Sequence, residues 1–441
     1  MRKLDLLEGD IKKILLHYLI PSVLSMLAVS AYVFVDTAFV GYGVGSTALA
    51  ALNISIPIYS VFTALHCTIG IGGGTLVSIA IGKGDEKEKN KVFSIAVIMA
   101  IIVGIILTII GVIFPKNIAS LLGATEEIKP LVSIYIGIIS AVSWAFLLVG
   151  VLSAFIRNDK NPRLVMIASI ISNLANVILD YVFIFIFDLG IAGAALATAI
   201  SPIINLLILS MHFLRQRGTL KFSKVAMESK IIKRIVKNGF GSFILEICGG
   251  IIIFILNNIF MKLGGELYVA AYGIIANIAF LGIAVFEGIG QSIQPVVSVN
   301  FGAKKRKRIL ESLKYAVILS MSFGIFIYVI FLLFPGAILK LFTKNDLQLI
   351  DITAKAMRIY FFGYALMGAN MVFLYFLQSI EESKMAIFIS LSRGIIFVIL
   401  GLIILTPAFK INGVWFSVSF SEICTFILGI FILKKDLKRN N

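Results

Sequence analysis

Charged residues are scarce in this chain. Only 14% of its 441 residues are Asp, Glu, Lys or Arg, and 59% are hydrophobic. A soluble globular protein has about 25% charged residues and about 45–50% apolar ones. Even well-packed soluble proteins keep a mixed surface, which this composition cannot supply. The composition therefore excludes a water-soluble protein and indicates a polytopic membrane protein.

Cysteine and histidine are also rare, with three residues of each. Cys67, Cys248 and Cys424 all fall inside apolar runs, which argues against a disulfide framework and against a cysteine metal site. The histidines show no metal-ligand spacing, and we interpret them as packing residues: His17, His66 and His212. No metal is expected beyond a transported or coupling Na⁺.

Nucleotide-binding and catalytic motifs are missing. The glycine-rich segment 70–75 lacks the GxxxxGK[ST] pattern of an ATP site. It lies within an apolar run, where small residues let helices approach closely. No HExxH motif or nucleophile–base pair is found. We therefore expect no enzyme activity and no cofactor, and a pump of this kind would draw its energy from an ion gradient.

Long apolar runs dominate what is present. A membrane-spanning helix needs about 20 mostly apolar residues. The chain contains twelve such runs: 14–40, 47–81, 92–115, 131–156, 164–187, 191–214, 234–262, 267–301, 313–335, 353–379, 385–407 and 411–433. They lack the alternating pattern of membrane β-barrel strands. The sequence predicts an all-α membrane protein with twelve transmembrane helices.

The net charge of +16 is spread unevenly over the connections. With the first residues in the cytoplasm, 30 of the 39 Lys and Arg residues fall on that side and eight on the other. Cytoplasmic loops carry such an excess, so both termini are expected in the cytoplasm. Basic loops beside a bilayer contact lipid headgroups, and we interpret the charge in this way, with no nucleic-acid partner.

The two halves of the chain repeat. A shift of 220 residues places Phe114 and Pro115 on Phe334 and Pro335, and the match extends over a long stretch without gaps. Six spans that begin and end on one side, followed by six more, form a parallel repeat. Such repeats place a cavity between two lobes and favour alternating access.

These boundaries define an N-terminal lobe (1–214), a cytoplasmic linker (215–233) and a C-terminal lobe (234–441). Because the two lobes already supply a two-fold arrangement, we expect a monomer.

Polar side chains inside the spans carry the functional signal, because a charge in the hydrocarbon costs at least about 2.5–3.5 kcal/mol. Asp36 lies in the outer half of the first span. Asn176 and Asp180 share one stripe of the fifth span, and Thr198 lies at a similar depth in the sixth. We expect these four to form a cation site. Two facing carboxylates suit a proton, and the same oxygens would hold Na⁺.

Two further residues of the first span bear on this site. Pro21 removes a backbone hydrogen bond within the span. We interpret it as a hinge that couples Asp36 to the shape of the lobe, with a static kink as the alternative. Tyr32 lies one turn from Asp36 and would bond that carboxyl group or serve as an aromatic anchor.

The C-terminal lobe does not duplicate this cluster, since Asp36 maps to Leu256 and Asp180 to Leu400. Its ionisable residues within spans are instead Glu246, Glu287, Arg393 and Glu422.

Glu246 lies near the middle of the seventh span, and Glu287 is followed one turn later by Gln291 in the eighth. We predict a substrate site or second cation site from Glu246, Glu287, Gln291 and Tyr32. An internal Glu–Arg pair involving Arg393 is the alternative.

Together these features resemble the MATE (multidrug and toxic compound extrusion) family over essentially the whole chain. The segment 35–41, Val-Asp-Thr-Ala-Phe-Val-Gly, closes the first span. Residues of spans one, five and six match the N-lobe cation site of the prokaryotic DinF-like branch: Pro21, Tyr32, Asp36, Asn176, Asp180 and Thr198. Glu246 resembles the span-seven acid of the NorM branch, but 353–379 lacks that branch's span-ten acid. The segment 287–303 resembles the MepA-like branch.

The resemblance implies a V-shaped, alternating-access antiporter in a bacterial cytoplasmic membrane. It would export cationic or lipophilic drugs and other toxic compounds in exchange for H⁺ or Na⁺, with small-molecule drugs, organic cations and membrane lipid as partners. The alternative within the superfamily is a flippase or exporter of an amphipathic, lipid-linked or natural metabolite. A channel or a non-transporting scaffold is the alternative from another class.

Overall fold

The computed structural model describes residues 5–215, 218–224, 226–340 and 346–439. The parts of the expected lobes and linker that fall on other residues lie outside this description. The secondary structure of the described residues is helical throughout. This confirms the predicted all-α fold.

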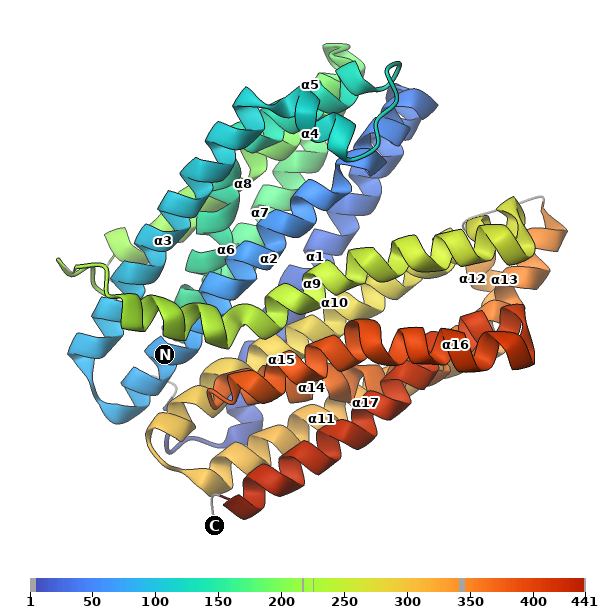
Figure 1. Cartoon of the computed structure of the whole chain (residues 1–441). Helices are drawn as coiled ribbons and strands as arrows, with labels where there is room; N and C mark the ends of the chain where they lie inside the picture. The colour runs from blue at the N-terminus through green and yellow to red at the C-terminus, as the bar shows by residue number, and fades with distance from the viewer. Residues whose placement is uncertain (1–4, 216–217, 225, 341–345, 440–441) are drawn as a thin grey trace.

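The helices follow the same order in both halves of the chain (Figure 1). The first half contains α1 (Ile11–Gly43), α2 (Ser46–Lys83), α3 (Glu86–Ile113), α4 (Pro115–Leu121), α5 (Lys129–Ala141), α6 (Ser143–Asn158), α7 (Pro162–Asp180), η1 (Tyr181–Ile186) and α8 (Gly190–Leu214). The second half contains α9 (Ser229–Gly264), α10 (Glu266–Gly302), α11 (Arg306–Leu333), α12 (Pro335–Leu339), α13 (Leu347–Tyr360), η2 (Phe361–Gly363), α14 (Tyr364–Ser379), α15 (Ser383–Leu391), η3 (Ser392–Ile396), α16 (Phe397–Phe409) and α17 (Ile411–Arg439).

The repeat is visible in the helix boundaries. The starts of α2 and α10, of α3 and α11, and of α4 and α12 are each 220 residues apart, at Ser46 and Glu266 for the first pair. The helix that opens the second half begins at Ser229 and not at residue 234, because Lys230 and Lys233 interrupt the apolar pattern of its first residues.

The number of spans agrees with the prediction. Among the described residues, eleven helical segments are long and apolar enough to cross a membrane, and α5 with α6 supplies a twelfth as a pair bent by 50°. The predicted fourth span, 131–156, is therefore not straight, since it bends at Val142. The fifth and eleventh spans pass through π-helical turns, η1 and η3. Such turns are frequent at functional sites.

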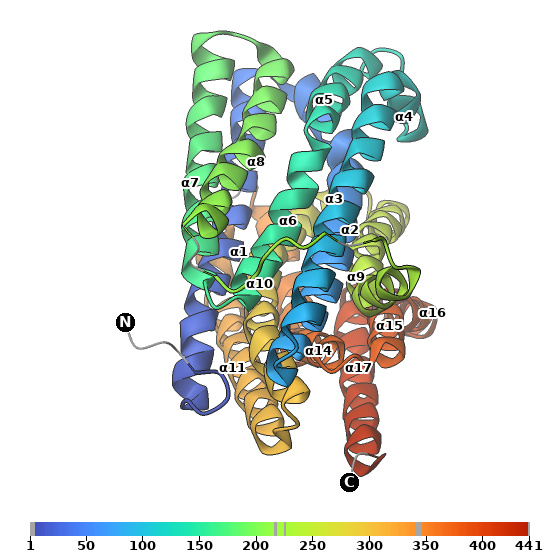
Figure 2. The same ribbon diagram turned by 90° about the vertical axis from the view of Figure 1, so that its left-hand side faces the viewer.

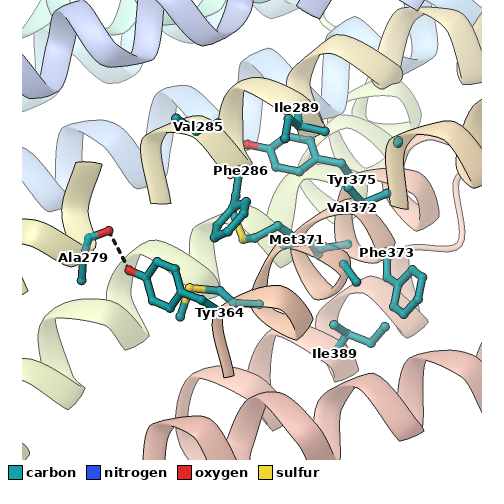
Figure 3. Packing of buried hydrophobic residues seen from close by; sticks show 14 of the residues in the cluster. Ala279, Val285, Phe286, Ile289, Tyr364, Met371, Val372, Phe373, Tyr375 and Ile389 are labelled. Carbon is teal, nitrogen blue, oxygen red and sulfur yellow. Dashed lines mark hydrogen bonds between the residues drawn. The ribbon is translucent and has the colours of Figure 1, made fainter. Parts of the chain in front are cut away.

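The core of the C-terminal lobe is continuous and aromatic (Figure 3). Phe286 of α10 packs against Tyr364 of α14, with ring centroids 5.7 Å apart. The Tyr364 hydroxyl donates to the carbonyl oxygen of Ala279 at 2.9 Å. This hydrogen bond satisfies the one polar atom of a side chain that is otherwise buried among apolar groups.

The core of the N-terminal lobe is divided into two parts. One apolar cluster surrounds Phe93 and Phe155, and the other surrounds Val40 and Tyr135. Along α7 the first cluster reaches Ala168 and the second begins beyond the end of the helix, in η1. The intervening part of α7 carries buried Ser, Asn and Asp residues. A polar layer therefore crosses the lobe between two apolar layers.

The two lobes touch at one end of the molecule. We call the end that holds the turns at 84–85 and 303–305 the terminal end, because α1 begins and α17 ends there, and the opposite end the distal end (Figure 1). A Cβ atom on Gly239 of α9 would lie 1.9 Å from the carbonyl oxygen of Thr68 in α2. One on Gly302 of α10 would lie 2.2 Å from that of Ile79. Glycine thus lets the backbones of opposite lobes meet.

At the distal end the lobes diverge. The distal helices of the first lobe, α4 and α5, and those of the second, α12 and α13, point in different directions (Figure 1). The molecule has the shape of a V that is joined at its terminal end.

Candidate functional site

Four oxygen-bearing side chains from three helices meet in the polar layer of the N-terminal lobe. Asp36 comes from α1, Asn176 and Asp180 from α7, and Thr198 from α8, and all four are buried. The four-residue spacing along α7 turns Asn176 and Asp180 to the same face. These are the residues that the sequence singled out as a cation site, and their role stays a prediction.

Hydrogen bonds connect the four groups. The carboxyl groups of Asp36 and Asp180 are hydrogen-bonded to each other. Asn176 Nδ2 donates to Thr198 Oγ1 at 3.4 Å. With its amide turned over, Asn176 donates to Asp180 Oδ2 at 3.2 Å and accepts from the Thr198 backbone N–H at 3.3 Å. In both orientations Asn176 bonds Thr198 of α8, and in the turned orientation it also links Asp180 to α8.

The carboxyl pair has unused bonding capacity. Oδ1 of Asp36 and Oδ1 of Asp180 are buried and have no hydrogen-bond partner within the described part of the chain. A hydrogen bond between two carboxyl groups also requires a proton, because an ionised carboxylate only accepts. Buried acceptors without partners are uncommon. Hard oxygen atoms of this kind fit a proton or a small hard cation such as Na⁺.

Three tyrosines surround the pair. Tyr32 of α1 interacts electrostatically with both Asp36 and Asp180, so the structure places it here and not beside the C-terminal acids. Tyr135 of α5 hydrogen-bonds Thr198, and its hydroxyl lies 2.9 Å from that of Tyr59. Tyr59 and Tyr135 could not be identified from the sequence, because nothing in their local sequence separates them from the other aromatic residues of the spans.

Pro21 lies about 22 Å before Asp36 along the axis of α1, at 1.5 Å per residue. The helix is continuous through this position, and Pro21 is buried. Proline has no N–H, so the carbonyl oxygen of His17 has no partner of the usual helical kind. The hinge assigned to Pro21 stays a prediction.

The C-terminal lobe contributes a second acidic pair. Glu246 of α9 and Glu287 of α10 interact electrostatically with each other, and both are half-buried. Cys67 of α2, in the opposite lobe, interacts with both of these acids. The pair therefore faces the boundary between the lobes.

Gln291, one turn beyond Glu287, bridges the lobes. Its Oε1 accepts a hydrogen bond from Nη1 of Arg157 in α6 at 2.5 Å. Its Nε2 donates to Sδ of Met26 in α1 at 3.7 Å. Gln291 also hydrogen-bonds Tyr375 of its own lobe. One side chain thus joins α10 to two helices of the other lobe.

Arg157 is a functional candidate that the sequence analysis missed. It directly follows the predicted fourth span, so it was counted with the basic residues of the next loop. In the structure α6 continues to Asn158, and Arg157 is 7% exposed. Only the contact with Gln291, 134 positions away, distinguishes it from a loop arginine.

Arg393 does form an internal Glu–Arg pair, and its partner is Glu422. Its Nε donates to Oε1 of Glu422 in α17 at 2.8 Å. Oε2 of Glu422 accepts from Nδ2 of Asn370 at 2.7 Å. Arg393 lies in the π-helical turn η3, which packs against both α17 and α9.

His212 also has a partner that packing alone does not explain. Its Nε2 lies 2.9 Å from Oδ2 of Asp159, and Asp159 also accepts from the N–H and hydroxyl of Thr219 and the N–H of Leu220. Burial raises the pKa of Asp159, but these hydrogen bonds outweigh burial and lower the pKa below its usual value. The start of the linker is thereby anchored to the first lobe.

Neither a cluster of metal ligands nor a disulfide occurs among the described residues. No group of three or more His, Cys, Asp or Glu side chains with a metal-site arrangement occurs among those that the structure describes. Cys67, Cys248 and Cys424 are free thiols.

Comparison with known proteins places the chain in one family. The MatE family model matches residues 21–182 and again 242–403. The multidrug export protein MepA of Staphylococcus saprophyticus is 26% identical over 435 residues, covering 98% of this chain and 96% of MepA. MepA of Staphylococcus haemolyticus is 27% identical over 429 residues, covering 97% of this chain and 94% of MepA.

Solved structures share the fold. An outward-facing multidrug resistance MATE transporter of the MOP superfamily has a TM-score of 0.94 at 22% identity, covering 100% of this chain and 98% of the other. A MOP superfamily transporter from Pyrococcus furiosus has a TM-score of 0.93 at 22% identity, covering 99% and 98%. The two matches of the family model, one in each repeat, cover most of the sequence. The chain therefore belongs to the MatE family of membrane transporters.

Proposed function

We propose that the chain exports cationic or lipophilic drugs across a bacterial cytoplasmic membrane in exchange for H⁺ or Na⁺. Support comes from the family and from the relatives, which are multidrug export proteins. The excess of basic residues at the terminal end supports placing both termini in the cytoplasm. We propose a monomer as the working unit, because each chain contains both lobes.

The single observation that carries ion coupling is the buried carboxyl pair, Asp36 and Asp180. Its unpartnered oxygens lie in the first lobe, apart from the acids between the lobes. Binding of a cation neutralises the pair, and release restores repulsion between like charges in a low dielectric. Helix α1 packs against α7 of its own lobe and against α10 of the other lobe. A shift of α1 on α7 would therefore alter the boundary between the lobes.

The closed terminal end determines from which side an ion can reach the carboxyl pair. Cross-lobe contacts shut that end, while the distal ends diverge (Figure 1). In this conformation the ion would enter from the distal side, which we place outside the cell. Pro21 lies on α1 between Asp36 and the closed end. We propose that α1 bends there when the ion binds.

The drug would bind at the boundary between the lobes. Glu246 and Glu287 are half-buried acids that face it, and a buried carboxylate attracts a cationic ligand strongly in a low dielectric. The Arg157–Gln291 contact lies on the terminal side of Glu287. It would separate a bound drug from the cytoplasm until the lobes move.

The test is dye efflux from proteoliposomes, with a pH gradient and a Na⁺ gradient imposed separately. The proposal expects efflux with one gradient and its loss in Asp36→Asn. Asp188→Asn is the matched control, because Asp188 is an exposed acid at the distal end in a conformation that suits asparagine.

Efflux by Asp36→Asn at the wild-type rate would refute coupling through this pair. Movement of an amphipathic lipid analogue in folded protein, with neither gradient required, would favour the flippase alternative.

A further inference from the structure

A groove of about 300 Å³ lies where the two lobes meet near the terminal end. Its walls and floor come from three helices, α1, α10 and α11, and its lining includes Lys12, Leu16, Ser292, Tyr315, Ile318 and Ser322. Figure 2 shows this part of α1 beside α10 and α11. The groove therefore has one wall in each lobe.

The shape of the groove follows from helical spacing. The α1 residues that line it run from Lys12 to Leu19, and those of α11 run from Tyr315 to Ser322. Each stretch covers about 10 Å of helix axis at 1.5 Å per residue. Leu16 and Ile318 on the two rims are 53% and 51% exposed. The groove is thus an elongated apolar trough that is open at the surface.

A positively charged side chain, that of Lys12, lies at one end of this trough. Lys12 is exposed and follows the first residue of α1, at the boundary between helix and aqueous loop. Its Nζ lies 5.2 Å from the centre of the Tyr315 ring on the opposite wall, within the range of a cation–π contact. The other lining residues are apolar apart from two serines.

We propose that this groove binds one anionic phospholipid, with its phosphate at Lys12 and the first part of an acyl chain along the trough. The charge at the mouth matches an anionic headgroup, and the apolar walls match a hydrocarbon chain. The groove opens at the end of the molecule that carries the basic loops, and anionic lipids populate the cytoplasmic leaflet.

The bound lipid has a mechanical consequence. It contacts α1 of the first lobe and α10 and α11 of the second, so it holds the terminal end closed. Opening of that end would separate the walls and release the lipid. The inference rests on the fold and the membrane position, and it does not depend on which substrate is exported.

Native mass spectrometry of the purified full chain tests this inference. Phosphatidylglycerol and phosphatidylcholine with identical acyl chains are offered together. The wild type is expected to retain phosphatidylglycerol about fivefold better, the contribution of one basic side chain at an anionic surface. Lys12→Gln should lose the preference. Lys13→Gln should keep it, because Lys13 is exposed on the same turn but does not line the groove.

A second variant separates the trough from general surface charge. Ser322→Trp fills the groove from its exposed rim and should lower retention of both lipids, with an unchanged unfolding temperature as the check on folding. Equal retention of the two lipids by the wild type would overturn the proposal, as would equal behaviour of Lys12→Gln and Lys13→Gln. Displacement of phosphatidylglycerol by soluble glycerol phosphate would also overturn it, because the site would then recognise a free phosphate.

Discussion

Arg234 of α9 and Glu88 of α3 bond the two lobes together at the terminal end. Arg234 Nη1 donates to Glu88 Oε1 at 2.8 Å, while Nε and Nη2 donate to the two oxygens of Glu381 at 2.8 Å each. The planar guanidinium can serve both acids at once. Glu381 belongs to the same lobe as Arg234, so of these three hydrogen bonds the one to Glu88 joins the two lobes.

Arg234→Gln should weaken closure of the terminal end. A partly exposed ion pair contributes about 1 kcal/mol or less, so the open population should rise by roughly fivefold or less. Cys67 reports this change, because it lies between the lobes beside Arg157. With Cys248 and Cys424 replaced by Ala, a maleimide added from the terminal side should label Cys67 faster. In Lys233→Gln, a change at an exposed neighbouring residue, Cys67 should be labelled as fast as in the protein with Arg234 and Lys233 unchanged. Equal labelling of the two variants would contradict this role of Arg234.

Asn176→Ala should weaken ion binding without abolishing the fold. The change removes the link between Asp180 and Thr198, and a buried polar group left unsatisfied costs about 1–3 kcal/mol. The ion concentration for half-maximal efflux should therefore rise roughly 5- to 150-fold. Asn173→Ala is the control, since Asn173 lies one turn away and its side chain donates to Ser169 Oγ at 3.5 Å, outside the cluster. A similar shift in both variants would mean that the effect is general to α7.

Glu422→Gln should destabilise the C-terminal lobe strongly. Arg393 and Glu422 are 10% and 4% exposed at their side chains, and removing one partner of a buried pair costs about 3–5 kcal/mol. Thermal unfolding in detergent measures the loss. The double variant Arg393→Met with Glu422→Leu should recover much of it, because no charge is then left buried. The exposed pair Lys355 and Asp351 supplies the contrast: Asp351→Asn should cost less than about 1 kcal/mol. Equal losses at the two pairs would contradict the assignment.

Asp159 should make stability depend on pH in the acid range. Its pKa in the folded protein is below the usual value of 3.8. Its contribution is therefore complete above the unfolded-state pKa and is lost as the pH falls through the folded-state pKa. As the pH is lowered from about 5, the unfolding temperature of Asp159→Asn should fall less steeply than that of the wild type. Glu126→Gln, at a side chain 90% exposed, should follow the wild-type curve. If the unfolding temperature of Asp159→Asn fell with pH as steeply as that of the wild type, Asp159 would be excluded as the cause of the acid dependence.

Several features could be predicted from the sequence because each depends on a local rule. A helix in lipid must satisfy its own backbone hydrogen bonds. Each span must therefore consist of one long run of mostly apolar residues. Ionisable residues such as Asp36 and Asp180 stand out against that background. Their common depth follows from helix rise and topology alone. The repeat needs only the comparison of one half of the chain with the other.

Other features were decided by tertiary structure. A bend at Val142 or a π-helical turn at Arg393 changes direction without changing hydropathy. Arg157 has the local sequence of a loop arginine, and only the closed boundary between lobes brings it to Gln291. Tyr135 likewise acquires its neighbours from α2 and α8.

The sequence by itself thus determined that the chain crosses a membrane in twelve helices, repeats itself and buries acids in the first lobe. The tertiary structure alone decided which acids have partners, which end is closed and where a groove opens between α1 and α11. Burial in lipid acts on each residue separately and is visible in the sequence, whereas contacts between helices far apart in the chain depend on how both of them pack.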